Sequence, residues 1–146
     1  MNHSSEDTIV IIDYGVGNLG SVANMLKKVG ARKVIFSSDP YEIASANKVL
    51  LPGVGSFDHG MKRLNDLGIS DALKTLVLRD DSLLMGICLG MQLLGMSSSE
   101  SGFNSGFGLV DGLVEKFSLN GLKIPHVGYN QVNINKKGKL DVAIEK

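Results

Sequence analysis

The chain of 146 residues has one cysteine, three prolines and no tryptophan, and its 15 Lys and Arg balance its 15 Asp and Glu. One cysteine can form neither an internal disulfide nor a zinc cluster of several thiolates, which favours a reducing, cytoplasmic location. The balanced charge lacks the basic footprint of a protein that binds nucleic acid or an anionic membrane. We therefore expect a globular protein that is stabilised by packing, with neither nucleic acid nor a membrane among its partners.

Long hydrophobic runs are also missing. No apolar stretch approaches the roughly 18 residues that a helix needs to span a bilayer. The first seven residues, MNHSSED, are polar and lack the hydrophobic region of a signal peptide. We interpret residues 1–7 as a flexible tail, in which His3 has no expected role. Residues 8–146 have a usual length for one domain.

Glycine is abundant, with 18 residues, and several of them directly follow short apolar runs. Uninterrupted β-branched runs are typical of strands buried on both faces of a parallel sheet. Residues 8–13 form such a run, and we predict four strands in all, at 8–13, 33–36, 48–51 and 83–87. Helical segments are predicted at 21–29, at 41–46, from the end of the glycine-rich loop at 52–56 to residue 67, and at 89–96. A further helix is predicted at 70–79, with a cap at Ser70-Asp71. The sequence thus predicts an α/β protein with a mostly parallel sheet flanked by helices.

The pattern changes after the fifth predicted helix. Residues 97–107 are polar and glycine-bearing, which favours a surface loop. Shorter strands are predicted at 109–117, 122–124 and 132–134. The last residues offer no closing helix or strand, so a doubly wound sheet is incomplete in its C-terminal part.

The single cysteine lies in Gly86-Ile-Cys-Leu-Gly90, between the fourth predicted strand and a helix. A strand that turns sharply into a helix holds one residue in a strained conformation, and the two glycines let the backbones approach closely. The side chain of Cys88 is then exposed at the strand's carboxyl end, where the helix N-terminus favours a thiolate. We interpret Cys88 as a nucleophile; the alternative is a buried, inert cysteine.

A second glycine-rich loop, Pro52-Gly-Val-Gly55, follows the third predicted strand. Because the carboxyl ends of parallel strands share one edge of the sheet, this loop can lie beside Cys88. Its N–H groups and that of Leu89 can then bind the oxygen of a tetrahedral intermediate, as acyl transfer to a cysteine requires. Together the two loops indicate attack on a carbonyl.

The histidines give no clear base for such a cysteine. His59 falls on the polar face of a predicted helix. His126 lies in the strand-rich C-terminal segment, where a structural or interface role is more usual than catalysis.

The loop Gly15-x-Gly17-x-x-Gly20 matches the dinucleotide-binding fingerprint, with Asp39 near the place of its ribose-binding acid. However, residues 13–14 separate the predicted strand from Gly15, whereas the fingerprint turns directly off its strand. Asp39 is also well explained as a helix cap. We therefore favour a tight loop with a closely packed helix over a nucleotide site.

Four motifs carry a resemblance to a known family. They are Asp13-Tyr-Gly-Val-Gly-Asn18, Leu51-Pro-Gly-Val-Gly55, Gly86-Ile-Cys-Leu-Gly-Met-Gln92 and Pro125-His-Val-Gly-Tyr-Asn-Gln-Val132. In this order and spacing they resemble the class I (triad) glutamine amidotransferases, and most closely the glutaminase subunits of imidazole glycerol phosphate synthase in histidine biosynthesis. The resemblance extends from about Thr8 to Val132 and implies a flavodoxin-like fold without its C-terminal part.

In that family a cysteine attacks the side-chain amide of glutamine, forms a γ-glutamyl thioester and releases ammonia. The resemblance implies that Cys88 is this nucleophile. It assigns the oxyanion region to Gly53, Val54 and Leu89, and glutamine binding to Gly55 and Gln92. It implies no cofactor and no metal.

The resemblance also implies a protein partner, a (β/α)8-barrel synthase subunit that receives the ammonia. The residues that correspond to the shared interface are Asn18, Pro125, His126, Tyr129 and Asn130.

Two departures from the family pattern limit this hypothesis. Members usually have tryptophan where this chain has Tyr129, which bears on docking and gating. The His and Glu of their triad follow the Pro-His-x-Gly segment, near the C-terminus, and no residue here matches either. We therefore expect little or no glutaminase activity from the chain alone. Two alternatives stay open: a paralogue that supplies ammonia for amidination of a surface sugar, and a non-catalytic module that docks on a synthase.

Overall fold

The computed structural model describes residues 8–118, 121, 125, 127–131 and 133. The described residues from Thr8 to Lys116 belong to one compact unit, and the described residues of the second unit, which begins at Phe117, contain no helix or strand. The predicted tail 1–7 and most of the strands predicted at 122–124 and 132–134 lie outside the described residues. The assignment of 8–146 to one domain stays a prediction.

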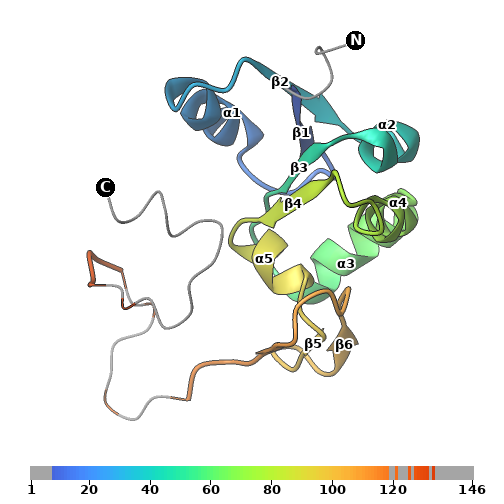
Figure 1. The fold of residues 1–146 in the computed structure, drawn as a ribbon. Coiled ribbons are helices and arrows are strands. Elements are labelled where there is room, and N and C mark those ends of the chain that lie inside the picture. Colours follow the sequence, from blue (N-terminus) through green and yellow to red (C-terminus); the bar gives the residue numbers. More distant parts are fainter. Residues whose placement is uncertain (1–7, 119–120, 122–124, 126, 132, 134–146) are drawn as a thin grey trace. The chain divides into compact units, whose positions relative to one another are not determined.

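Four parallel strands form the main sheet of the first unit (Figure 1). They are β1 (Thr8–Ile12), β2 (Lys33–Ser37), β3 (Lys48–Leu51) and β4 (Leu83–Gly86), in the spatial order β2-β1-β3-β4. The helices are α1 (Leu19–Lys28), α2 (Pro40–Ser45), α3 (Phe57–Asp66), α4 (Ile69–Leu76) and α5 (Leu89–Leu93). This arrangement confirms the predicted α/β fold, and its strand order reverses between β1 and β3, the place where such sheets bind ligands.

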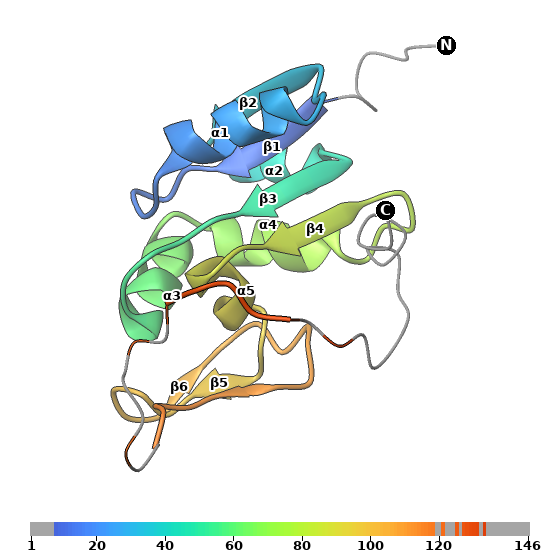
Figure 2. The same cartoon turned by 90° about the vertical axis from the view of Figure 1, so that its left-hand side faces the viewer.

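The helices cover the two faces of the sheet unequally. On one face, Ile11 and Leu50 pack against α1 alone. On the other, Val10, Ile12 and Leu51 pack against a core built from α2, α3, α4 and α5. Figure 2 shows α1 on one side of the sheet and α2 and α4 on the opposite side. The main core therefore lies between the sheet and four helices.

Side chains at the helix N-termini explain where two helices begin. The Asn18 side chain accepts a 3.2 Å hydrogen bond from the N–H of Ser21 and caps α1. The Asp39 side chain accepts a 2.9 Å bond from the N–H of Tyr41 and caps α2. Both caps satisfy a backbone N–H that the helix leaves without a partner. The interpretation of Asp39 as a helix cap is thereby confirmed.

The cap predicted at Ser70-Asp71 is wrong. α4 begins one residue earlier, at Ile69, and its N-cap is Gly68, whose φ of 70° suits a residue without a Cβ. Ser70 is buried, and its hydroxyl donates to the side-chain oxygen of Asn65. A tertiary contact thus uses the side chain that the local pattern assigned to the cap.

The segment after Cys88 differs from the prediction because α5 ends early, at Leu93. The N–H of Phe107 donates to the carbonyl of Leu93, and the N–H groups of Leu109 and Val110 donate to that of Leu94, each at 2.9 to 3.0 Å. These bonds satisfy the carbonyls at the helix end without a further turn.

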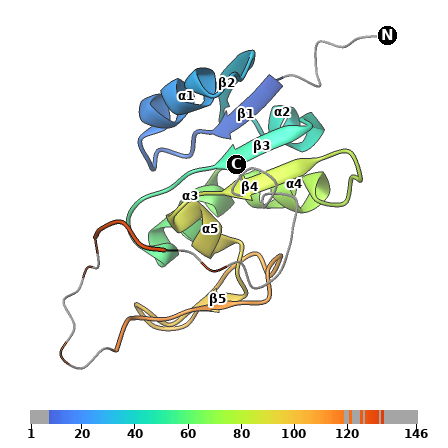
Figure 3. The same cartoon turned by 60° about the vertical axis from the view of Figure 1, so that its left-hand side comes forward.

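A small second sheet replaces the surface loop predicted at 97–107. It pairs β5 (Ser97–Ser98) with β6 (Asn104–Ser105) and β7 (Leu113–Val114), and Ser98 is buried. Figures 1 and 3 show it next to α5, on the side away from β1 and β2. Of the strand predicted at 109–117, only residues 113–114 form one.

Candidate active site

Cys88 is held at a sharp turn between β4 and α5. Its φ of 55° and ψ of −119° make it the one non-glycine residue with a positive φ in the described part of the chain. Such a conformation costs about 1–3 kcal/mol and persists only where the surroundings fix it. The thiol is exposed. The strained, exposed position is confirmed, whereas the role of Cys88 as a nucleophile stays a prediction.

The two glycines that flank the cysteine are required by close backbone contacts. A Cβ on Gly90 would overlap the carbonyl oxygen of Leu51, and a Cβ on Gly86 would lie 2.6 Å from the backbone N and Cα of Met91. No side chain fits at either position. The start of α5 can therefore approach β3 and β4 closely, as the sequence predicted.

The loop after β3 packs directly against the first turn of α5. A Cβ on Gly53 would lie 3.1 Å from the Cβ of Leu89 and 3.2 Å from the backbone N of Gly90. This confirms that the two glycine-rich loops meet at one edge of the sheet. Val54 is exposed, and Gly55 has a φ of 100°.

The arrangement brings backbone donors close to the thiol. Leu89 is the first residue of α5, so its N–H has no partner within the helix, and its side chain is fully buried in the core. The N–H of Gly90 donates instead to the carbonyl of Ile87 at 3.0 Å. Gln92, half-buried one turn further along α5, donates its N–H to the carbonyl of Cys88.

Tyr14 is the site residue to which the sequence analysis gave no role. Its side chain is fully buried, and its phenol donates a 2.8 Å hydrogen bond to the carbonyl of Pro52. Its own carbonyl accepts a 3.1 Å bond from Nε of Arg63 in α3. Burial, and then the nearby charge of a Cys88 thiolate, raise the pKa of Tyr14 to about 12. The phenol therefore stays protonated, and remains a donor, at neutral pH.

The glycines after β1 lie in a loop that packs against the loop at Gly53. Gly17 has a φ of 113°, and a Cβ there would lie 3.6 Å from the Cα of Gly53. A Cβ on Gly20 would meet nothing within 4 Å. In a dinucleotide-binding fingerprint the third position must be glycine because helix and strand pack closely there. No such contact requires a glycine at position 20 of this chain. The geometry supports a tight loop, which packs against the neighbouring loop, whereas the close packing of the helix that we also expected does not occur at Gly20.

The other predicted site residues are placed only in part. His59 is exposed on α3, as expected, and Asn18 caps α1. His3 and His126 lie outside the described residues. Pro125, Tyr129 and Asn130 belong to the second unit, so their role at a partner interface stays a prediction.

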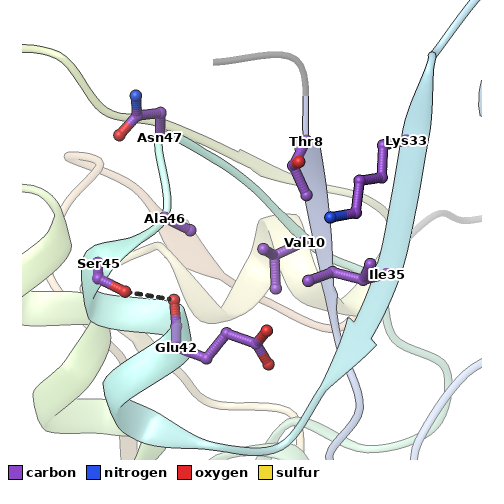
Figure 4. Close-up of a pocket in the computed structure, with 8 residues that line it drawn as sticks. All are labelled: Thr8, Val10, Lys33, Ile35, Glu42, Ser45, Ala46 and Asn47. Carbon is purple, nitrogen blue, oxygen red and sulfur yellow. Dashed lines mark hydrogen bonds between the residues drawn. The ribbon is translucent and has the colours of Figure 1, made fainter. Parts of the chain in front are cut away.

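A cavity of about 300 Å³ lies at the amino ends of the strands rather than at this edge (Figure 4). Thr8 and Lys33, which line it, are the first residues of β1 and β2, whereas Cys88 follows the carboxyl end of β4. In Figure 4 the side chains of Lys33 and Glu42 lie on either side of Val10 and Ile35. The cavity is thus separate from the candidate active site.

The described residues contain no group of three or more His, Cys, Asp or Glu side chains placed to hold a metal ion. None of their helices is long and apolar enough to cross a membrane.

Comparison with known proteins identifies the family. Residues 10–142 match the family described as Glutamine amidotransferase class-I. Imidazole glycerol phosphate synthase subunit HisH 2 of Methanococcus maripaludis is 49% identical over 133 residues, which are 90% of this chain and 65% of that protein. Subunit HisH 1 of Campylobacter jejuni is 47% identical over 90% of this chain and 66% of its own length. Subunit HisH of Leptospira interrogans is 42% identical over 94% and 69%.

The chain thus spans about two thirds of the length of these relatives. The match includes the glycine-rich loops at 15–20 and 52–55 and the elbow around Cys88. Because the family match covers residues 10–142, the chain belongs to the class I glutamine amidotransferase family.

Proposed function

We propose that this chain provides the nucleophile of a glutaminase that supplies ammonia to a synthase in histidine biosynthesis. The observation that carries the proposal is the exposed Cys88 at a strained elbow, with the Gly53 loop packed on the first turn of α5. The names of the relatives, subunits of imidazole glycerol phosphate synthase, support it.

The chemistry starts with a bond from the Cys88 thiolate to the side-chain carbonyl carbon of glutamine, whose oxygen takes the negative charge. When this intermediate collapses, the C–N bond breaks and the nitrogen takes a proton from a general acid and leaves as ammonia. Water then attacks the γ-glutamyl thioester, the C–S bond breaks, and glutamate leaves. The thiolate is restored.

The backbone around Cys88 suits the charged oxygen of this intermediate. We assign the donors to the N–H of Leu89 and to the loop at Gly53 and Val54, which the close contact of Gly53 with Leu89 holds together. Loss of one such donor typically costs about 3–4 kcal/mol in the barrier. Glutamine binding falls to Gly55 and Gln92, which lie on the same loop and the same helix.

The ammonia passes to a protein partner in this proposal. The partner is a (β/α)8-barrel synthase subunit, which docks on Asn18 and on the segment from Pro125 to Asn130.

Labelling of Cys88 tests the proposal. A glutamine analogue that carries an electrophilic carbon should alkylate Cys88, in the presence of the barrel subunit from Methanococcus maripaludis, and free glutamine should slow the reaction. Cys88→Ala should abolish it. If Cys88 resists the analogue while the chain still binds the barrel subunit, the chain is a docking module and the proposal is wrong.

A second measurement identifies the enzyme that accepts the ammonia. The barrel subunit that purifies with the chain from its native source should act in histidine biosynthesis. A partner that amidinates a surface sugar would assign the chain to the paralogous function instead.

A further inference from the structure

The cavity at the amino ends of β1 and β2 carries two opposite charges beside an apolar floor (Figure 4). Val10, Ile35 and Ala46 supply the apolar part of its lining. Lys33 lines the cavity from β2, and Glu42 lines it from α2. Figure 4 shows the amine of Lys33 pointing toward Val10 and the carboxylate of Glu42 extending beneath Val10 and Ile35. A ligand on this floor therefore meets a cation from one element and an anion from another.

The strand register explains why Lys33 faces the cavity. Lys33 is paired with Thr8, and Ile35 with Val10, so the four side chains lie on one face of β1 and β2. This is the face that packs on the main core, to which Val10 belongs and against which Ile35 packs. The amine of Lys33 is thus held above apolar side chains of the inner face of the sheet.

Arg79 holds the wall of the cavity that follows α2. Its Nη1 donates hydrogen bonds to the carbonyls of Ala44 and Ala46, at 3.0 and 3.1 Å. Its Nη2 donates a 2.7 Å bond to the side-chain oxygen of Asn47. The carbonyl of Asn47 also accepts a 2.7 Å bond from the N–H of Leu83. Because these bonds fix the wall before any ligand arrives, little ordering of the chain opposes binding.

The two charges of the cavity are not used by the fold itself. The ion pairs in the described part of the chain are Lys62–Asp66, Lys74–Asp71 and Arg79–Asp81, so neither Lys33 nor Glu42 belongs to one. Both side chains are exposed. A ligand can therefore pair with them without breaking an existing ion pair.

We propose that this cavity binds a free α-amino acid with an aliphatic side chain. The carboxylate of the ligand pairs with Lys33, its ammonium group pairs with Glu42, and its side chain lies on Val10 and Ile35. A ligand with a single charge leaves one of the two groups of the cavity without a partner. The volume of about 300 Å³ is at the lower end for ligand pockets, which suits a small molecule of this kind.

Calorimetric titration of the full chain of 146 residues with leucine tests the proposal. We expect saturable binding of one leucine per chain. Asparagine has a side chain of similar shape but places an amide on the apolar floor, so it should bind at least fivefold more weakly. Glutamine is unsuitable as a probe because the proposed function places it at Cys88.

Two derivatives of leucine assign the charges. Leucine amide lacks the carboxylate and N-acetyl-leucine lacks the ammonium group, and each should bind at least threefold more weakly than leucine. Lys33→Met should abolish the difference between leucine and leucine amide. Glu42→Gln should abolish the difference between leucine and N-acetyl-leucine. Each combination of a changed ligand and a changed residue isolates one contact.

Matched controls come from the end of the first unit. Lys116→Met and Glu115→Gln remove the same charges from exposed side chains that do not line the cavity. Both variants should bind leucine with the affinity of the parent chain. All four variants should keep its circular dichroism spectrum.

Two outcomes would overturn the inference. If leucine does not bind, Lys33 is an inward-pointing charge of the kind that protects the edge of a sheet from pairing. If Lys33→Met and Glu42→Gln bind leucine and its derivatives as the parent chain does, the ligand lies elsewhere. Cys88 follows the carboxyl end of β4, away from this cavity, so failure of the proposed function would not change either result.

Discussion

The phenol of Tyr14 donates a buried hydrogen bond to the carbonyl of Pro52, 38 residues further along the chain. This bond ties the loop after β1 to the loop after β3. Because Gly53 follows Pro52 and packs against Leu89, the bond also fixes the loop that lies beside Cys88. Tyr14 is thus a positioning residue for the candidate active site.

Tyr14→Phe should destabilise the fold by about 1–3 kcal/mol, since it leaves the carbonyl of Pro52 buried without its donor. Urea denaturation of both proteins measures the change. Tyr41→Phe is the matched control, because Tyr41 is 86% exposed, and it should leave stability unchanged. Equal stability of Tyr14→Phe and the parent chain would show that the bond contributes nothing.

Stability should fall at high pH because the folded state holds the Tyr14 phenol protonated. The pKa of Tyr14 is about 12 in the folded chain against 10.0 ordinarily. The contribution of the protonated Tyr14 phenol to folding stability is fully present below pH 10 and is lost as the pH rises from 10 through 12. A pKa difference of two units between folded and unfolded chain corresponds to roughly 2–3 kcal/mol. Denaturation at several pH values should show this loss in the parent chain and not in Tyr14→Phe. An identical pH dependence in both proteins would contradict the assignment.

Local patterns in the sequence predicted the parts of the molecule that local physics determines. The short apolar runs predicted the four parallel strands, and Gly86 and Gly90 predicted a sharp turn at Cys88, because a turn between strand and helix needs glycine whatever the rest of the fold does. The helix cap at Asp39 is another feature that local sequence predicted.

Contacts between distant residues determined what the sequence did not predict. The bond from Tyr14 to Pro52 leaves no signal in either loop alone. The early end of α5 depends on donors from Phe107 and Leu109, and the missing cap at Ser70 depends on Asn65.

Gly90→Ala should be one of the most damaging substitutions in the chain. The added Cβ would overlap the carbonyl oxygen of Leu51, so α5 would have to move away from β3. We expect a loss of more than about 3 kcal/mol, or no folded protein at all. Gly20→Ala is the control, because a Cβ there meets nothing within 4 Å inside α1, and it should stabilise by up to about 1 kcal/mol. Thermal denaturation compares the two, and similar melting temperatures would contradict the packing described for the elbow.

Cys88→Gly should make the protein more stable while it removes the proposed nucleophile. Glycine adopts a positive φ without the strain that a Cβ adds, so the gain should be about 1–2 kcal/mol at the φ of 55° observed for Cys88. Cys88→Ser keeps the Cβ and the strain, and its stability should match that of the parent chain. Urea denaturation of the three proteins measures these differences. If Cys88→Gly were no more stable than Cys88→Ser, the elbow would store no strain. If it were more stable, the chain would carry a side chain at position 88 at the expense of its own stability, which is expected where that side chain has a function.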